Sequence, residues 1–175
     1  METSENNYVY VLIAGGRKFH DRRWMVRQIE AIVSRNNGST VRIIHGGARG
    51  ADRLAGECAR DAGLEVGVFG ADWDRYGKSA GYRRNEKMAR FLARKRDAGA
   101  HVEVVLFPGG KGTGHMRQIA KAHQLPVFQP VAQAAPVEVE SFEEACEAVE
   151  SDLRREAAWE AAYEAVELAM VCHEL

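Results

Sequence analysis

Three pairs of adjacent glycines follow runs of apolar residues, at positions where a strand of a sheet would end. They are Gly15-Gly16, Gly46-Gly47 and Gly109-Gly110. Glycine has no side chain beyond its α-carbon, so the backbone amides of such a turn can approach an anion closely. Arg17 and Arg49 follow the first two pairs, and a guanidinium group can bind phosphate through two hydrogen bonds. The pattern predicts contacts to a phosphate-bearing ligand, although such a turn beside a surface arginine also occurs without one.

The segment Phe107–His115 has the strongest of these signals, because it contains four glycines within six residues. We expect it to end a strand and begin a helix, with Gly112 in the turn and Thr113 as the helix N-cap. Free amides and the helix dipole favour an anion at such a helix start. In the segment that follows Gly46-Gly47, Gly50 and Asp52 stand at the expected start of another helix. Asp52 either contacts the ligand or caps that helix.

A long polar connection is expected over residues 70–81, between a strand and a helix. Connections of this length in compact domains usually have a function. Trp73 within it, or Tyr82 after it, offers a flat ring on which a base can stack, unless Trp73 only closes the loop onto the protein body. Lys78 and Arg84 can neutralise the charge of a phosphate. The connection is therefore a further candidate for ligand contact.

Alternating strands and helices are the elements that must position these segments. Short β-branched or apolar runs predict five strands, and amphipathic stretches between them predict helices. The expected strands span residues 8–14, 41–45, 64–69, 102–107 and 126–128, and the expected helices start at Asp21 and span residues 51–62, 82–97 and 113–123. This alternation is typical of an α/β protein with a Rossmann-like, doubly wound, mostly parallel sheet of about five strands. Ligands of such sheets bind beyond the carboxyl ends of the strands, so the glycine pairs would meet at one edge.

Composition limits the class of protein. The chain has 175 residues, 46% of them hydrophobic and 28% charged, which fits a globular protein with one main domain. No apolar run approaches the roughly 20 residues that cross a bilayer, and the polar N-terminus is unlike a signal peptide. We therefore expect a cytoplasmic protein without a membrane partner. The three cysteines are far apart and predict neither disulfides nor a zinc site, and we expect no metal and no cofactor.

Charge is distributed unevenly along the chain. Residues 1–136 have 22 Lys and Arg against 13 Asp and Glu, a balance of +9, whereas residues 137–175 have 2 against 12, a balance of −10. The basic part suits an anionic ligand. The acidic part begins with a capping box, Ser141 and Glu144, and predicts a helical extension over residues 137–175. Its apolar stripes either pack on the protein's own domain or form a contact in a homo-oligomer, which the opposite charges would favour.

Four of these segments, in order along the chain, resemble a known family: GGRKFHD, HGGARGADRLA, ADWDRYGKSAGYRRNEKMA and PGGKGTGHM. They are similar to the YspA-like, cpYpsA-related branch of the SLOG superfamily. That superfamily also includes the LOG phosphoribohydrolases and the DNA-processing protein DprA. The resemblance runs from about residue 8 to residue 131. It implies a Rossmann-like nucleotide-binding domain over residues 8–131 and a nucleotide-derived ligand, in a branch often found in phage and bacterial conflict contexts.

One position departs from the pattern of the LOG enzymes. Their motif ends in a Glu that takes part in cleaving an N-glycosidic bond, and Met116 stands at that position here. A methionine side chain cannot transfer a proton. Asp52 and Glu86 are the candidates that could supply the missing carboxylate if the protein were an enzyme.

The most favoured interpretation is a sensor or sequestering module that binds a nucleotide or an ADP-ribose-like ligand. The glycine turns and Thr113 would contact phosphate and ribose, the arginines would neutralise charge, and Asp52 and Asn85 would hold sugar hydroxyl groups. One alternative is a nucleoside monophosphate phosphoribohydrolase or a related nucleosidase. A second alternative is single-stranded DNA binding, which is disfavoured because the chain has no RNP-like aromatic run or basic recognition helix.

Overall fold

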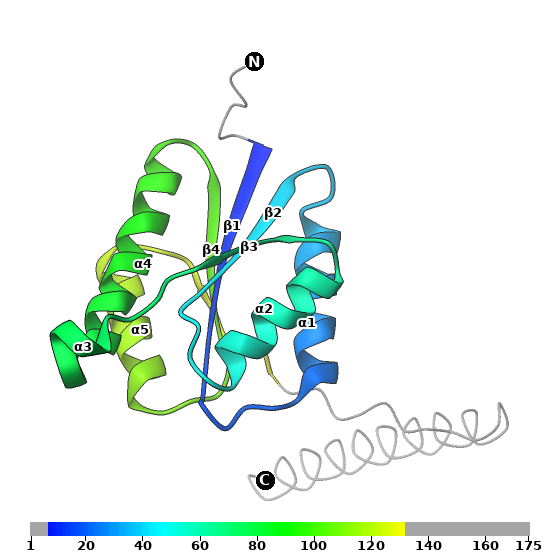
Figure 1. The fold of residues 1–175 in the computed structure, drawn as a ribbon. Coiled ribbons are helices and arrows are strands. Elements are labelled where there is room, and N and C mark those ends of the chain that lie inside the picture. Colours follow the sequence, from blue (N-terminus) through cyan, green and yellow to red (C-terminus); the bar gives the residue numbers. More distant parts are fainter. Residues whose placement is uncertain (1–6, 132–175) are drawn as a thin grey trace, which may run out of the picture. The chain divides into compact units, whose positions relative to one another are not determined.

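The computed structural model describes residues 7–131, which form one five-stranded sheet with helices on both faces (Figure 1). All strand pairs are parallel, and the order across the sheet is β3-β2-β1-β4-β5. The predicted α/β class and the Rossmann-like, doubly wound architecture are confirmed. The extension predicted for residues 137–175, together with its homo-oligomer contact, lies outside the described residues.

The central strand of the sheet is β1, which pairs with β2 on one side and with β4 on the other. It is buried from Val9 to Ala14, and a strand covered on both faces needs such an unbroken apolar run. The chain proceeds from β1 to β2 and β3 in one direction and then returns to β4 and β5, so the strand order switches between β1 and β4. The strands span Tyr8–Ala14 (β1), Thr40–His45 (β2), Glu65–Val68 (β3), His101–Leu106 (β4) and Val127–Phe128 (β5).

Two helices pack on each face of the sheet (Figure 1). One face is covered by α1 (Arg22–Arg35) and α2 (Ala51–Asp61), and the other by α4 (Ala80–Asp97) and α5 (Lys111–Ala122). Each pair encloses its own apolar core. Among the buried residues are Met25, Ile29, Ile32 and Phe107 in the first core and Leu12, Met88, Leu92 and Met116 in the second.

The helix start predicted at Asp21 is confirmed. Oδ1 of Asp21 accepts a hydrogen bond from N of Trp24 at 2.8 Å, which satisfies one of the free amides at the start of α1. The helix α1 ends at Arg35, and Asn36 follows as its C-cap. Gly63, just beyond α2, has a φ of +71°, the conformation that favours glycine after a helix.

The predicted start of α5 is wrong. The helix begins at Lys111 with Gly110 as its N-cap, so Thr113 lies in the first turn and is buried. The hydroxyl of Thr113 packs against Gly109, where any side chain larger than hydrogen would collide with it. Thr113 is therefore a member of the helix and not its cap.

The sequence predicts that α4 begins at Tyr82, whereas the helix begins two residues earlier, at Ala80. Residues 70–81 are not a plain connection, because they contain the single helical turn α3 (Trp73–Tyr76) and a 3-10 turn at residues 77–79. Oδ1 of Asp72 accepts a hydrogen bond from N of Arg75 at 3.0 Å and so caps α3. This local capping folds the connection and brings it towards the ends of the strands.

Candidate functional site

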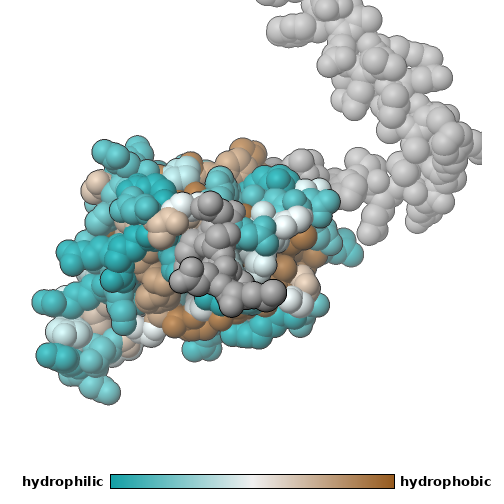
Figure 2. Space-filling model, turned by 90° about the horizontal axis from the view of Figure 1, so that it is seen from above, coloured by the Kyte–Doolittle hydropathy of each residue, from teal (hydrophilic) through white to brown (hydrophobic). Residues whose placement is uncertain are grey.

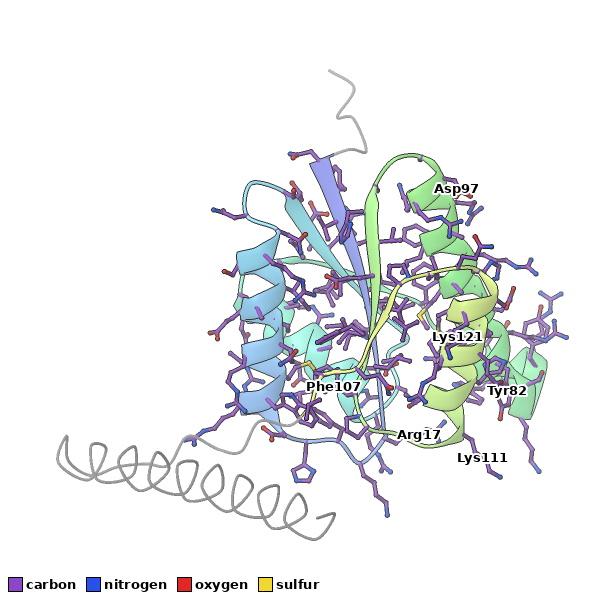
Figure 3. The ribbon with its side chains drawn as sticks, turned by 180° about the vertical axis from the view of Figure 1, so that it is seen from behind. Arg17, Tyr82, Asp97, Phe107, Lys111 and Lys121 are labelled. Carbon is purple, nitrogen blue, oxygen red and sulfur yellow. The ribbon has the colours of Figure 1, made fainter. Side chains whose placement is uncertain are left out.

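A cleft of about 530 Å³ lies beyond the carboxyl ends of β1 and β4, where the strand order switches. Figure 3 shows Arg17, Lys111 and Tyr82 at this end of the sheet, with Asp97 at the opposite end. Figure 2 views that opposite end, where the strands begin, and shows a surface of mixed hydropathy. The cleft brings together most of the predicted contacts: Gly15, Gly16, Arg17, Asp52, Trp73, Lys78, Arg84, Asn85, Gly110, Gly112 and Thr113.

The turns after β1 and β4 pack backbone against backbone. N of Gly16 donates a hydrogen bond to O of Pro108 at 2.9 Å, and a Cβ on Gly16 would lie 2.8 Å from that oxygen. A Cβ on Gly109 would lie 2.7 Å from N of Gly16. Gly50 has a φ of +87°, and its neighbour Ala51 donates from N to O of Gly16 at 3.2 Å. Gly50 and Gly109 therefore hold the turns together and do not line the cleft.

The first turn of α5 is the part of the cleft best suited to an anion. No side chain caps this helix, and the first backbone bond of the turn runs from N of Gly114 to O of Gly110 at 3.0 Å. The amides of Lys111, Gly112 and Thr113 have no acceptor among the described residues, as at any uncapped helix start. Gly110, Lys111 and Gly112 are exposed, and a Cβ on Gly110 or Gly112 would meet open space, so an anion can approach this turn. The helix dipole adds a partial positive charge.

Asp52 is buried in the floor of the cleft and organises the β2–α2 loop. Its Oδ2 accepts hydrogen bonds from N of Gly46 at 3.1 Å and N of Ala48 at 3.4 Å. The same oxygen lies 3.7 Å from a guanidinium nitrogen of Arg84. Burial raises the pKa of Asp52, and the charge of Arg84 opposes that rise. Asp52 is thus both a loop-holding carboxylate and the only acidic side chain among the described residues that line the cleft.

Arg84 and Asn85 on α4 connect the two glycine-rich loops across the cleft. Arg84 donates from NH1 to O of Gly46 and from Nε to Oδ1 of Asn85, the latter at 3.0 Å. Asn85 donates in turn from Nδ2 to O of Gly112 at 3.2 Å. Burial lowers the pKa of Arg84, while the carboxylate of Asp52 raises it. This chain of contacts fixes the relative positions of the β2–α2 loop and the start of α5.

Two aromatic rings stand at the rim of the cleft. Trp73 is 50% exposed and Tyr82 is 46% exposed, so neither is part of the core. Half of the Trp73 side chain is therefore accessible to a ligand, while the other half is covered by the protein and lies near Gly81 of α4. The edge of the Tyr82 ring packs against His115 with centroids 4.4 Å apart, which limits its movement. Lys78, from the 3-10 turn between them, also lines the cleft.

A second hollow, of about 640 Å³, adjoins the cleft beside the β2–α2 loop. It holds three further predicted contacts, Gly46, Gly47 and Arg49. The two hollows share four lining residues: Arg17, Ala48, Trp73 and Arg84. The sequence prediction missed Arg53 in this hollow and Lys111 in the cleft. Both could have been found, because Arg53 lies one helical turn after Arg49 and Lys111 stands between two glycines of the α5 turn.

His45, at the end of β2, is a structural residue. It is 3% exposed, and its Nδ1 accepts a hydrogen bond from N of Gly47 at 3.0 Å. Its Nε2 is buried without a partner among the described residues and lies against Gly56 of α2. Burial, together with the charges of Arg60 and Arg84, lowers the pKa of His45 to about 4. The ring is therefore neutral near pH 7 and supports the glycine loop.

Glu86 does not line the cleft. It lies in a separate hollow between α4 and α5, where Oε1 accepts from Nε of Arg90 at 2.8 Å and lies 3.2 Å from Nε2 of His123. The hydrogen bond from Arg90 is the main cause of its lowered pKa. Met116 is fully buried in the core beneath α5. Of the two candidate carboxylates, only Asp52 is therefore in the cleft.

A doubly wound parallel sheet with a cationic cleft at its switch point defines a Rossmann-like protein with its site in the usual place. Residues 9–76 match the YspA, cpYpsA-related SLOG family. The chain is also 37% identical over 125 residues to the Gene 61 protein of Mycobacterium phage D29, a match that covers 67% of this chain and 93% of that protein. The chain therefore belongs to the YspA, cpYpsA-related SLOG family, which points to a nucleotide-related ligand-binding module.

Among solved structures, a predicted subunit of a tRNA methyltransferase from Methanocaldococcus jannaschii is similar at 15% identity and a TM-score of 0.31. The likeness covers 73% of this chain and 69% of that one, and it is too weak to bear on function. Within residues 7–131, no helix is long and apolar enough to cross a membrane. The same part of the chain contains no group of three or more His, Cys, Asp or Glu side chains arranged to hold a metal ion.

Proposed function

We propose that this protein binds a phosphorylated nucleotide or an ADP-ribose-like molecule in the cleft, as a sensor or sequestering module, and does not turn it over. The observation that supports this most strongly is the uncapped start of α5. Its three free amides stand beside Lys111, at the edge of a cleft whose other cations are Arg17, Lys78 and Arg84. This arrangement provides donors and positive charge for a phosphate group.

The expected positions of the sugar and the base follow from the residues that line the rest of the cleft. With a phosphate on α5, the sugar would lie over the floor formed by Asp52 and Asn85. Both side chains are polar and line the cleft, and their contacts within the protein hold them in place, so they can offer hydrogen bonds to hydroxyl groups without rearranging. The base would lie at the rim, where Trp73 and Tyr82 expose about half of their surface. A stacked base is worth roughly 1–3 kcal/mol.

Binding is favoured over hydrolysis by the position of the carboxylates. Cleavage of an N-glycosidic bond requires a carboxylate beside the sugar and a proton donor for the leaving base, and each such group typically contributes about 10²–10⁴-fold. Asp52 is engaged with two loop amides and Arg84, Glu86 lies outside the cleft, and Met116 is in the core. A phosphoribohydrolase remains the second candidate function, because Asp52 does line the cleft.

The test is to incubate the protein with nucleoside monophosphates, NAD and ADP-ribose, and to separate the products by chromatography. The proposal predicts that the bound molecule is recovered intact. Release of free base over several turnovers, abolished by Asp52→Asn but unaffected by Glu86→Gln, would instead establish the hydrolase. Mass spectrometry of small molecules released from natively purified protein would identify the ligand itself.

A further inference from the structure

The second hollow, beside the β2–α2 loop, has an unusual balance of charge. Its lining includes four arginines, Arg17, Arg49, Arg53 and Arg84, and no carboxylate from the described residues. Arg84 is held by Gly46 and Asp52. The side chains of the other three form no hydrogen bond or ion pair with any described residue. Like charges gathered in a concave surface raise the local concentration of anions there.

This hollow differs from the cleft in the groups that it offers. At the start of α2, Asp52 already accepts hydrogen bonds from N of Gly46 and N of Ala48. Those amides are therefore occupied by a carboxylate of the protein. An anion in the second hollow would bind to the exposed guanidinium groups of Arg49 and Arg53, whereas an anion in the cleft would bind to the amides of α5.

The two hollows are adjacent, since Arg17, Ala48, Trp73 and Arg84 line both. Trp73 stands at their junction and exposes half of its surface. The cleft and the second hollow thus each attract anions, and the ring of Trp73 lies between them. A mononucleotide with phosphate at one end would fill the cleft and leave the second set of arginines without a counter-charge.

We propose that the second hollow is a separate anion subsite, and that the ligand is a nucleoside derivative with phosphate groups at two ends. This inference rests on the proposed function, because it takes the cleft as the first phosphate site. Arg49 and Arg53 bind the second phosphate through charge-assisted hydrogen bonds, and the nucleoside spans the junction beside Trp73.

Calorimetric titrations with adenosine 3′,5′-bisphosphate and with AMP test this inference. The variant is Arg49→Gln/Arg53→Gln, which removes two exposed side chains with no described partner and leaves the fold intact. The control is Arg60→Gln/Arg94→Gln, which removes the same charge from exposed positions outside both hollows. The first pair should weaken binding of the bisphosphate by roughly 10- to 100-fold and binding of AMP by less than about threefold, because only the bisphosphate forms charge-assisted hydrogen bonds with these two arginines. The control should change neither.

Other outcomes count against the inference in distinguishable ways. Equal losses for both probes, or no loss for the bisphosphate, would overturn the second subsite and leave the cleft as the phosphate site. Failure of the wild-type protein to bind either probe would contradict the proposed function and the inference together. Crystals soaked in inorganic phosphate give an independent measurement: the inference requires one ion at the start of α5 and another at Arg49 and Arg53, the second lost in the double variant. A single ion at α5 would overturn it.

Discussion

A guanidinium nitrogen of Arg84 lies 3.7 Å from Oδ2 of Asp52, and both side chains are almost fully withdrawn from solvent. This pair joins α4 to the β2–α2 loop, and Asn85 extends the connection to the start of α5. The walls of the cleft are therefore positioned by buried polar contacts within the protein itself. Preorganisation of this kind reduces the cost of ordering the site on binding.

Arg84→Met should destabilise the protein strongly, because it leaves the carboxylate of Asp52 buried without its cation. Removing one partner of a buried pair typically costs about 3–5 kcal/mol. The free energy of unfolding in urea measures the loss. The double variant Arg84→Met/Asp52→Asn should recover part of it, since the uncompensated charge is gone. A single variant as stable as the wild type would show that the pair does not support the fold.

Stability should fall as the pH is lowered from about 6.5 to about 4. Burial holds His45 neutral in the folded protein with a pKa of about 4, whereas in the unfolded chain it gains a proton near pH 6.5. The unfolded state thus binds more protons in this range, which corresponds to a loss of roughly 3 kcal/mol by pH 4.

Urea unfolding at several pH values, repeated with His45→Asn, checks this prediction. Asparagine can still accept from N of Gly47, so the loop is retained while the titration is removed. Asp52, whose pKa is raised by burial, changes stability in the opposite direction, and the difference between wild type and variant isolates His45. Parallel pH profiles for the two proteins would contradict the assignment.

Gly109 and Gly110 are adjacent but should respond differently to alanine. A Cβ on Gly109 would collide with the backbone of Gly16 and Gly15, whereas a Cβ on Gly110 would meet nothing within 4 Å. Gly109→Ala should lower the free energy of unfolding by about 1–3 kcal/mol, the usual cost of overpacking. Gly110→Ala should leave it within about 0.5 kcal/mol of the wild type. Equal losses at the two positions would show that the turns do not pack as described.

Trp73→Ala should weaken nucleotide binding while the protein still folds. Half of the side chain is covered, so its removal should lower the free energy of unfolding by about 1–3 kcal/mol. The loss of a stacking surface should reduce affinity by about tenfold or more. Titration calorimetry measures the effect, and Trp73→Phe, which retains a ring, should restore most of the affinity. An unchanged affinity for Trp73→Ala would place the base elsewhere.

Much of the fold could be predicted from local patterns. The apolar run before Gly15 and the capping residue Asp21 each determine their element through nearby residues, and the structure has both as expected. The predicted start of α5 is wrong because Thr113 is a good N-cap by residue type, and the prediction relied on residue type alone. In the structure Thr113 lies inside the helix and its hydroxyl lies against Gly109, a contact that only the folded turn creates.

The candidate site, like the fold, could be predicted only in part from the sequence. Glycine pairs at strand ends indicated where the cleft would be, since parallel strands bring their carboxyl ends to one edge. The pattern could not show that Gly50 and Gly109 support the turns instead of the ligand, because this depends on backbone contacts between distant segments. Nor could it show that Glu86 lies outside the cleft, which depends on which side of α4 borders α5.

The most direct test of the account is the thermal stability of the protein in the presence of nucleotides, dinucleotides and ADP-ribose derivatives. A ligand that binds the folded state stabilises it in proportion to ln(1 + [L]/Kd), by roughly 2.7 kcal/mol at about 100-fold excess over Kd. Gly110→Val should abolish the rise in Tm by covering the amides of α5, and Gly114→Val, in the same helix but outside the cleft, should retain it. If no compound in the panel raises the Tm of the wild-type protein, or if Gly110→Val responds as the wild type does, the cleft is not the phosphate site.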